Sequence, residues 1–184
     1  MTHDTVVFDI ETKNSFADVG GEENLKKLDV SVVGVYSYKD DAYYCFGENE
    51  FEKIKEIFQR SNLLVGFAIK RFDLPVLEKY FLPKGDFNFY NIPCFDILEE
   101  IEKSLGRRVG LGDLAMANLG LGKTAVSLEA IDFYRNGEME KLKNYCLNDV
   151  KITKELYEML KNQGYLWIPQ KFSAKMLKWE YRAT

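Results

Sequence analysis

Residues 6–12 of the chain read Val6-Val7-Phe8-Asp9-Ile10-Glu11-Thr12. The apolar start of this run is typical of a buried strand. Because residues i and i+2 of a strand point to the same face, the carboxylates of Asp9 and Glu11 project together. Two like charges there are costly unless a cation lies between them. The pattern favours a metal site, and the alternative is a strand that ends at Glu11 with two solvated acids.

The segments that follow predict an α/β sheet. Apolar runs predict further strands at 31–38, 42–46, 63–68 and 92–95, with a polar turn at 39–41 that makes the second and third strands an antiparallel hairpin. Helical spacing of apolar residues predicts helices at 50–59, 74–81, 96–105, 111–119, 128–135 and 139–161. An opening three-strand meander followed by alternating strands and helices indicates a mixed sheet with helices on its faces.

The domain organisation is expected to be simple, because no repeat and no linker rich in Gly, Pro and Ser interrupts the pattern. We expect one domain over 1–164, with 165–184 as a tail or helix packed on it. Basic residues recur there at helical spacing beside apolar ones: Lys171, Lys175, Lys178 and Arg182 beside Phe172, Met176 and Trp179. This stripe could track a nucleic-acid strand. The alternative is a terminal helix that packs its apolar face and solvates its lysines.

Composition excludes several classes of protein. The 184 residues are 46% hydrophobic and 14% aromatic, which indicates a folded chain. No run approaches the ~18 apolar residues of a membrane span, and no secretory signal precedes the first strand, so we expect no membrane partner. Three widely spaced cysteines, Cys45, Cys94 and Cys146, fit free thiols in a reducing cytoplasm.

Charge and histidine content narrow the chemistry. The formal net charge is −4, so a phosphate partner would have to be engaged locally rather than by bulk positive charge. The single histidine is His3, near the N-terminal end of the sequence. This count argues against Ser-His-Asp or Cys-His catalysis, His-ligated zinc and a histidine general base.

Three later residues could share a site with the opening acids. Asp73 falls between a predicted strand and a predicted helix, where it could cap the helix or join a ligand site at the strand end. Tyr145 and Asp149 lie four residues apart in the longest helical pattern, so both side chains lie on one helix face. The alternative for that pair is a core tyrosine beside a surface aspartate.

Taken together, these motifs resemble those of the DEDDy 3′–5′ exonucleases of the ribonuclease H-like superfamily. Residues 8–12 resemble the first motif, residues 66–75 the second in the style of family B DNA polymerase proofreading domains, and residues 145–149 the third. The resemblance spans about residues 5–160. In a related group histidine replaces the tyrosine of the third motif, and the only histidine of this chain is His3. The tyrosine subtype is therefore the one implied.

The resemblance implies a ribonuclease H-like fold and a two-metal mechanism. It implies that Asp9, Glu11, Asp73 and Asp149 hold two Mg²⁺ or Mn²⁺ ions, and that Tyr145 orients the attacking water. The partner implied is the 3′ end of single-stranded DNA or RNA, with DNA favoured, in a process such as DNA repair. Four site carboxylates and two divalent cations would cancel in charge, which would ease the approach of a polyanion.

The predicted substrate contacts are Phe16, Phe72 and Ala68. Phe16 lies in the loop after the opening strand, where it could stack on a base, although an ordinary surface loop is the alternative. Ala68 stands where asparagine is usual in the polymerase domains, which bears on substrate affinity and rate rather than on metal binding. Alternative functions are a catalytically weak or silent nucleic-acid-binding module of the same fold, a metal-dependent endonuclease, and an unrelated metalloprotein.

Overall fold

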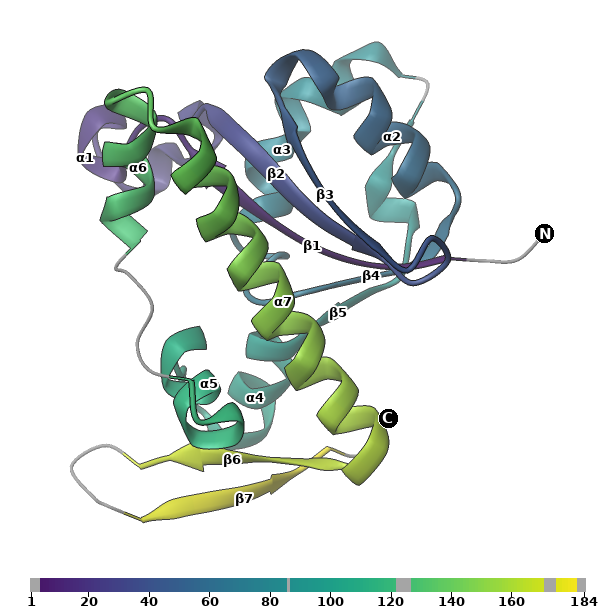
Figure 1. Ribbon diagram of the computed structural model, residues 1–184, viewed down its shortest axis with the longest axis vertical. Helices are drawn as coiled ribbons and strands as arrows, with labels where there is room; N and C mark the ends of the chain where they lie inside the picture. The colour runs from purple at the N-terminus through teal and green to yellow at the C-terminus, as the bar shows by residue number, and fades with distance from the viewer. Residues whose placement is uncertain (1–3, 86, 122–126, 171–174, 182–184) are drawn as a thin grey trace.

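A five-stranded mixed sheet lies at the centre of the protein (Figure 1). The computed structural model describes residues 4–85, 87–121, 127–170 and 175–181. The sheet order is β3-β2-β1-β4-β5, with β1 in the middle. The strands are β1 (Asp4–Thr12), β2 (Val30–Ser37), β3 (Ala42–Gly47), β4 (Ser61–Gly66) and β5 (Cys94–Asp96). β1, β2 and β3 form the antiparallel meander, and β4 and β5 run parallel to β1, which confirms the predicted fold class.

Helices cover both faces of this sheet. They are α1 (Phe16–Val19), α2 (Phe51–Gln59), α3 (Asp73–Phe81), α4 (Ile97–Leu105), α5 (Leu111–Leu119), α6 (Ser127–Arg135) and α7 (Met139–Gln163). Short 3-10 turns are η1 (Glu22–Lys27), η2 (Glu48–Glu50), η3 (Leu82–Lys84) and η4 (Phe89–Asn91). α2 and α3 lie on one side of the sheet and the long α7 crosses the other side (Figure 1). The loop expected after the opening strand therefore contains α1 and η1.

The alternation of β1 explains where its acids point. Val6, Phe8 and Ile10 are buried in the core that β1 shares with α2 and α3. Val7 is buried in the opposite core, which includes residues of α4, α5 and α7. Since Asp9 and Glu11 continue the alternation of Val7, their side chains face α7. The sheet thus carries the acids to the side that α7 covers.

A glycine lets α7 come close to the sheet. Gly34 of β2 pairs with Asp9 of β1. A Cβ atom at Gly34 would lie 2.8 Å from Cys146 Sγ and 2.9 Å from Val150 Cγ2, both on α7. Such distances are too short for a real Cβ atom, so any other residue would force the side chains of Cys146 and Val150 to move. The close approach brings this part of α7 directly over Asp9.

Of the two expectations for 165–184, a tail or a helix, the helix is wrong for the described part of that segment. α7 ends at Gly164, which adopts a left-handed φ of 77°, and an antiparallel hairpin of β6 (Tyr165–Pro169) and β7 (Met176–Glu180) follows. Leu166, Ile168 and Trp179 are buried in the α7-side core. Inward residues alternate with outward ones, which is the period of a strand. Lys171, Phe172 and Arg182 of the proposed stripe lie outside the described residues.

The lengths and compositions of the described helices bear on membrane insertion. Within the described ranges, none combines the length and the apolar character that a membrane-spanning helix requires.

Candidate active site

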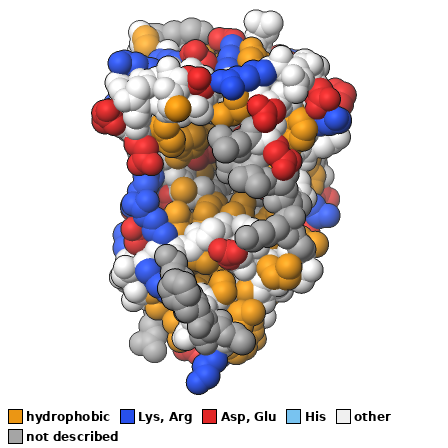
Figure 2. Space-filling view, turned by 90° about the vertical axis from the view of Figure 1, so that its left-hand side faces the viewer, with side chains coloured by type: hydrophobic (Ala, Val, Ile, Leu, Met, Phe, Trp, Pro, Cys, Tyr) orange, Lys and Arg blue, Asp and Glu red, His pale blue; other side chains and the backbone are white. Residues whose placement is uncertain are grey.

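The five residues that the motifs single out line one cavity. It has a volume of about 340 Å³ and collects side chains from β1, α3 and α7. Its carboxylates and phenol are Asp9, Glu11, Asp73, Tyr145 and Asp149. Figure 2 shows a hollowed surface, with hydrophobic side chains gathered in it, on the side of the molecule where α1 and α6 lie. Segments more than sixty residues apart in sequence therefore meet at one place.

The acids of β1 lie beside a buried thiol. The thiol of Cys146 lies 3.6 Å from the Asp9 carbonyl oxygen and 3.8 Å from Asp9 Oδ2. One ligand atom from each of Asp9, Glu11 and Cys146 lies within 4.8 Å of the others. Burial raises the pKa of Asp9 well above its ordinary value, and the charges of Asp73, Glu11 and Asp149 raise it further. Burial, followed by the charges of Asp149 and Asp73, raises the pKa of Glu11 in the same direction.

Asp73 is fixed by the backbone of β1. It is the first residue of α3 and is 2% exposed. Its Oδ1 accepts a hydrogen bond of 3.0 Å from the backbone N–H of Ile10. Burial raises the pKa of Asp73 to about 8, although the Ile10 N–H opposes that shift by stabilising the carboxylate. The N-cap of α3 is Phe72, so Asp73 links the helix to β1 instead of occupying the cap position predicted as the alternative.

Tyr145 and Asp149 reach the cavity from one face of α7. Their spacing of four residues places both side chains on the same side of the helix, and both line the cavity. Burial raises the pKa of Asp149 to about 6. The aspartate is therefore not the solvated surface acid of the alternative interpretation.

The cavity has the donor set of a divalent cation site. Each of its four acids has a raised pKa because the carboxylates are desolvated without a counter-charge. Among the described residues, no lysine or arginine lines the cavity. Carboxylate oxygens are the ligands that Mg²⁺ and Mn²⁺ prefer, and a cation would relieve the repulsion. The residues present thus fit the predicted metals in chemistry and in charge.

Aromatic side chains form the rest of the wall. Phe16 and Phe72 line the cavity and contact each other edge to face, with ring centroids 5.9 Å apart. Phe67 and Ala68 line it as well. All three predicted substrate contacts, Phe16, Phe72 and Ala68, therefore lie at the cavity, and their role remains a prediction.

Sequence reasoning missed Gly34 and the position of Cys146. A glycine inside a β-branched run was the available signal for Gly34, because it marks the close approach of another backbone. Cys146 lies between the tyrosine and aspartate of the third motif, but nothing in the sequence shows that its thiol turns toward Asp9. All three cysteines are free. Contact with Cys45 raises the pKa of the Cys146 thiol and lowers that of the Cys45 thiol.

Comparison with known proteins identifies the superfamily of the chain and one solved structure with a similar fold. The family model of the RNase H superfamily matches residues 6–161. None of the curated proteins compared with the chain matches it. A solved structure with a similar fold is the family B DNA polymerase of the hyperthermophilic archaeon Pyrobaculum calidifontis, with a TM-score of 0.65 and 17% identity over 88% of this chain and 25% of that chain. The present chain thus spans about a quarter of the polymerase, and the likeness concerns the fold. The match over residues 6–161 shows that the chain belongs to the ribonuclease H superfamily, as its motifs predicted.

Proposed function

We propose that the protein is a divalent-metal-dependent 3′–5′ exonuclease that hydrolyses single-stranded nucleic acid, with DNA preferred to RNA. The observation that carries the proposal is the convergence of Asp9, Glu11, Asp73 and Asp149 with Tyr145 on one cavity. Membership of the ribonuclease H superfamily points to a nuclease. The fold likeness to a DNA polymerase supports DNA as the substrate. The three free thiols fit a reducing compartment such as the cytoplasm.

The four carboxylates would hold two Mg²⁺ or Mn²⁺ ions. Bound divalent ions supply Lewis acidity and an activated water for phosphodiester hydrolysis. Burial and the charges of Asp73, Glu11 and Asp149 raise the pKa of Asp9, so Asp9 lies close to the other three acids and would be the central ligand. Asp73 is held beside β1 by the Ile10 N–H, which would fix its orientation as a ligand.

The remaining residues bind, orient and exclude water. The Tyr145 hydroxyl can donate and accept a hydrogen bond, so it would orient the attacking water beside Asp149. Phe16 and Phe72 would flank the terminal base with apolar surface. The same rings keep bulk water from the carboxylates, which strengthens electrostatic interactions in the cavity. The chain's residues thus divide into an acidic side that faces the phosphate and an aromatic side that faces the base.

The dimensions of the cavity favour a chain end. About 340 Å³ is at the small end of the range of small-molecule pockets, roughly 300–1,000 Å³. This volume would accommodate one terminal nucleotide. An unpaired 3′ terminus can enter such a cavity, which supports removal of single nucleotides over internal cleavage.

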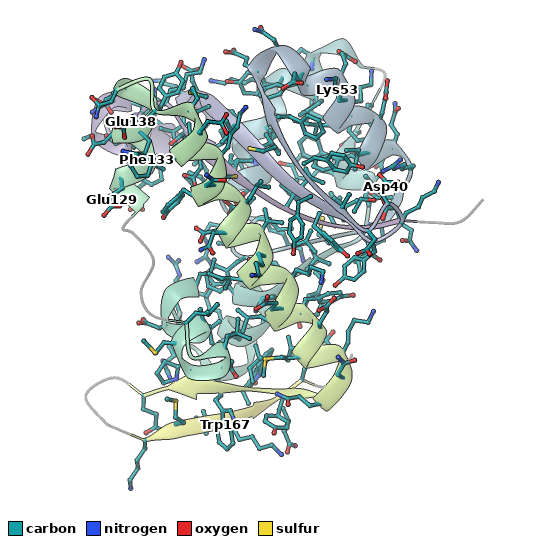
Figure 3. The ribbon with its side chains drawn as sticks, viewed as in Figure 1. Asp40, Lys53, Glu129, Phe133, Glu138 and Trp167 are labelled. Atoms are coloured by element: carbon teal, nitrogen blue, oxygen red, sulfur yellow. The ribbon has the colours of Figure 1, made fainter. Side chains whose placement is uncertain are left out.

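A labelled-oligonucleotide time course tests the proposal. Single-stranded DNA and RNA, labelled at the 5′ or the 3′ end, are incubated with Mg²⁺, Mn²⁺ or EDTA. We expect 5′-labelled DNA to shorten one nucleotide at a time, 3′-labelled DNA to release a mononucleotide at once, and EDTA to stop both. Asp9→Asn and Asp149→Asn should abolish the reaction, while Glu129→Gln, at an exposed position of α6 (Figure 3), should not.

The same gel separates the alternatives. Internal fragments from both labels would identify an endonuclease. Unchanged oligonucleotide with either metal would identify a silent module. Full activity of Asp9→Asn or in EDTA would overturn the metal-dependent mechanism.

A further inference from the structure

The loop after β4, residues 67–72, is held in a conformation that its sequence does not favour. Ala68 has a φ of 65°, in the left-handed region. Alanine disfavours that region because its Cβ atom approaches the following carbonyl oxygen. Such strain persists only where the surroundings determine the backbone, and it is often found at functional sites. Some other group must therefore hold the loop.

That group is Asp96, at the junction of β5 and α4. Asp96 pairs with Gly66 across the sheet and is 2% exposed. Its Oδ1 accepts a hydrogen bond of 2.9 Å from the backbone N–H of Ala68, and its Oδ2 accepts one of 3.0 Å from that of Lys70. Oδ1 also accepts a 3.2 Å bond from the Glu99 N–H, which caps α4. One buried carboxylate thus fixes the strained residue and the loop beyond it.

The clamped loop supplies part of the aromatic side of the cavity. Phe67, Ala68 and Phe72 line the cavity that holds the carboxylates. Ala68 also lines a neighbouring cavity of about 240 Å³, to which Asp96 contributes. The Ala68 carbonyl accepts hydrogen bonds of 3.0 Å from the backbone N–H groups of both Arg71 and Phe72. The backbone conformation of Ala68 therefore helps to determine the position of Phe72.

The acidic side of the cavity is anchored separately. Asp73 follows Phe72 but is held by the Ile10 N–H, which belongs to β1. Asp9 and Glu11 belong to β1, and Asp149 belongs to α7. Asp96 makes no hydrogen bond to these anchors, although its charge adds to burial in raising the pKa of Asp73. Loss of the Asp96 hydrogen bonds, here called the clamp, should loosen the wall formed by Phe67, Ala68 and Phe72 and leave the carboxylates in place.

We propose that Asp96 is a positioning residue that fixes the wall formed by Phe67, Ala68 and Phe72 against the terminal nucleotide of the substrate, without binding the cations. This inference rests on the proposed function for the identity of the substrate. The hydrogen bonds that Asp96 accepts from Ala68 and Lys70 do not depend on that identity.

Asp96→Ser is the variant that separates positioning from helix capping. Serine is as good an N-cap as aspartate, so α4 keeps its cap. Its single, shorter oxygen cannot serve both Ala68 and Lys70. Asp96→Asn keeps one acceptor oxygen and should lie between the wild type and Asp96→Ser. Asn88→Ala, which removes the side chain that accepts the Tyr90 N–H at η4, controls for a lost cap elsewhere.

Kinetic constants and Mn²⁺ affinity of the variants test the proposal. For Asp96→Ser we expect KM for single-stranded DNA to rise about tenfold, the size expected for losing hydrogen bonds that order the wall. kcat and the Mn²⁺ dissociation constant should stay within about twofold. Adding Ala68→Gly should recover part of the KM, because glycine adopts the left-handed region without strain. A fall in kcat with unchanged KM, or weakened Mn²⁺ binding, would overturn the proposal.

Amide hydrogen exchange tests the clamp independently of activity. In Asp96→Ser, exchange at Ala68 and Lys70 should accelerate at least tenfold, and exchange at Ile10 should not change. Equal protection at Ala68 in both proteins would refute the clamp. If the wild type degrades no nucleic acid, the proposed function fails, while this exchange experiment still decides whether Asp96 fixes the wall.

Discussion

Replacing Asp149 with asparagine should stabilise the metal-free protein at neutral pH. Burial raises the pKa of this carboxyl from an ordinary value of 3.8 to about 6. The folded state therefore holds a proton that the unfolded chain has lost, and stability falls as pH rises from 3.8 through 6. Asparagine has nearly the same shape and no charge, so the variant avoids this penalty.

The pKa difference sets the size of the effect. A difference of one in pKa corresponds to about 1.36 kcal/mol, so a rise from 3.8 to about 6 corresponds to on the order of 3 kcal/mol. The full gain applies only above pH ~7, where the carboxyl is ionised in both states. At pH 4 the folded carboxyl is protonated and the unfolded one is roughly half ionised, so the gain should fall to about 0.5 kcal/mol.

Urea unfolding in EDTA, followed by circular dichroism at pH 4 and pH 7.5, measures this difference. We expect Asp149→Asn to exceed the wild type by about 2–3 kcal/mol at pH 7.5 and by only about 0.5 kcal/mol at pH 4. Glu129→Gln, an exposed acid, should match the wild type at both. Replacing the EDTA with Mn²⁺ should stabilise the wild type more than Asp149→Asn, because the variant has lost one ligand. An Asp149→Asn variant no more stable than the wild type at pH 7.5 would refute the reasoning.

Two further substitutions test the packing that positions the site. Gly34→Ala would place a Cβ atom 2.8 Å from Cys146 Sγ. We expect this change to destabilise the fold by about 1–3 kcal/mol and to weaken Mn²⁺ binding. A melting curve and a Mn²⁺ titration measure the two effects. Asp4 is buried at the far end of β1, where it accepts hydrogen bonds from Ser37 Oγ at 2.5 Å and Lys39 N at 3.0 Å. Asp4→Ala should cost about 2–4 kcal/mol in urea unfolding yet leave the Mn²⁺ affinity of the folded protein unchanged; weakened binding would mean that the site is less independent than its anchors indicate.

The central part of the fold was predictable because short-range patterns and burial agree there. The valine-rich runs of β1 and β2 are buried in the sheet centre, as their composition indicates. The alternation of β1 also predicted that Asp9 and Glu11 share a face. The convergence of Asp73, Tyr145 and Asp149 on that face was expected only through the resemblance, since no local pattern specifies which helix face meets which strand end.

The C-terminal hairpin shows where periodicity misled. Lysines at 171, 175 and 178 have helical spacing, yet Leu177 and Trp179 alternate with exposed neighbours as in a strand. Charged residues constrain a surface weakly, whereas burial of Trp179 constrains it strongly. The apolar alternation was therefore the better guide. The strand β4 likewise ends at Gly66, two residues earlier than predicted, because Ala68 turns into the left-handed region.

The role of Asp96 was not accessible from sequence. An aspartate before Ile97 predicts at most a helix cap, which it is. Its second function depends on the pairing of β5 with β4, which brings Asp96 beside Gly66 and within reach of Ala68. Long-range pairing of this kind leaves no local signature, so the clamp is visible only in the folded protein.

Counting bound Mn²⁺ by electron paramagnetic resonance tests the central claim most directly, because the proposed hydrolysis depends on the carboxylate cluster being a cation site. The wild type should bind two Mn²⁺ per chain at saturation, with displacement by Mg²⁺. Asp9→Asn should lose both tight sites, and Glu129→Gln should lose neither. Absence of saturable Mn²⁺ binding by the wild type, or full binding by Asp9→Asn, would contradict the account.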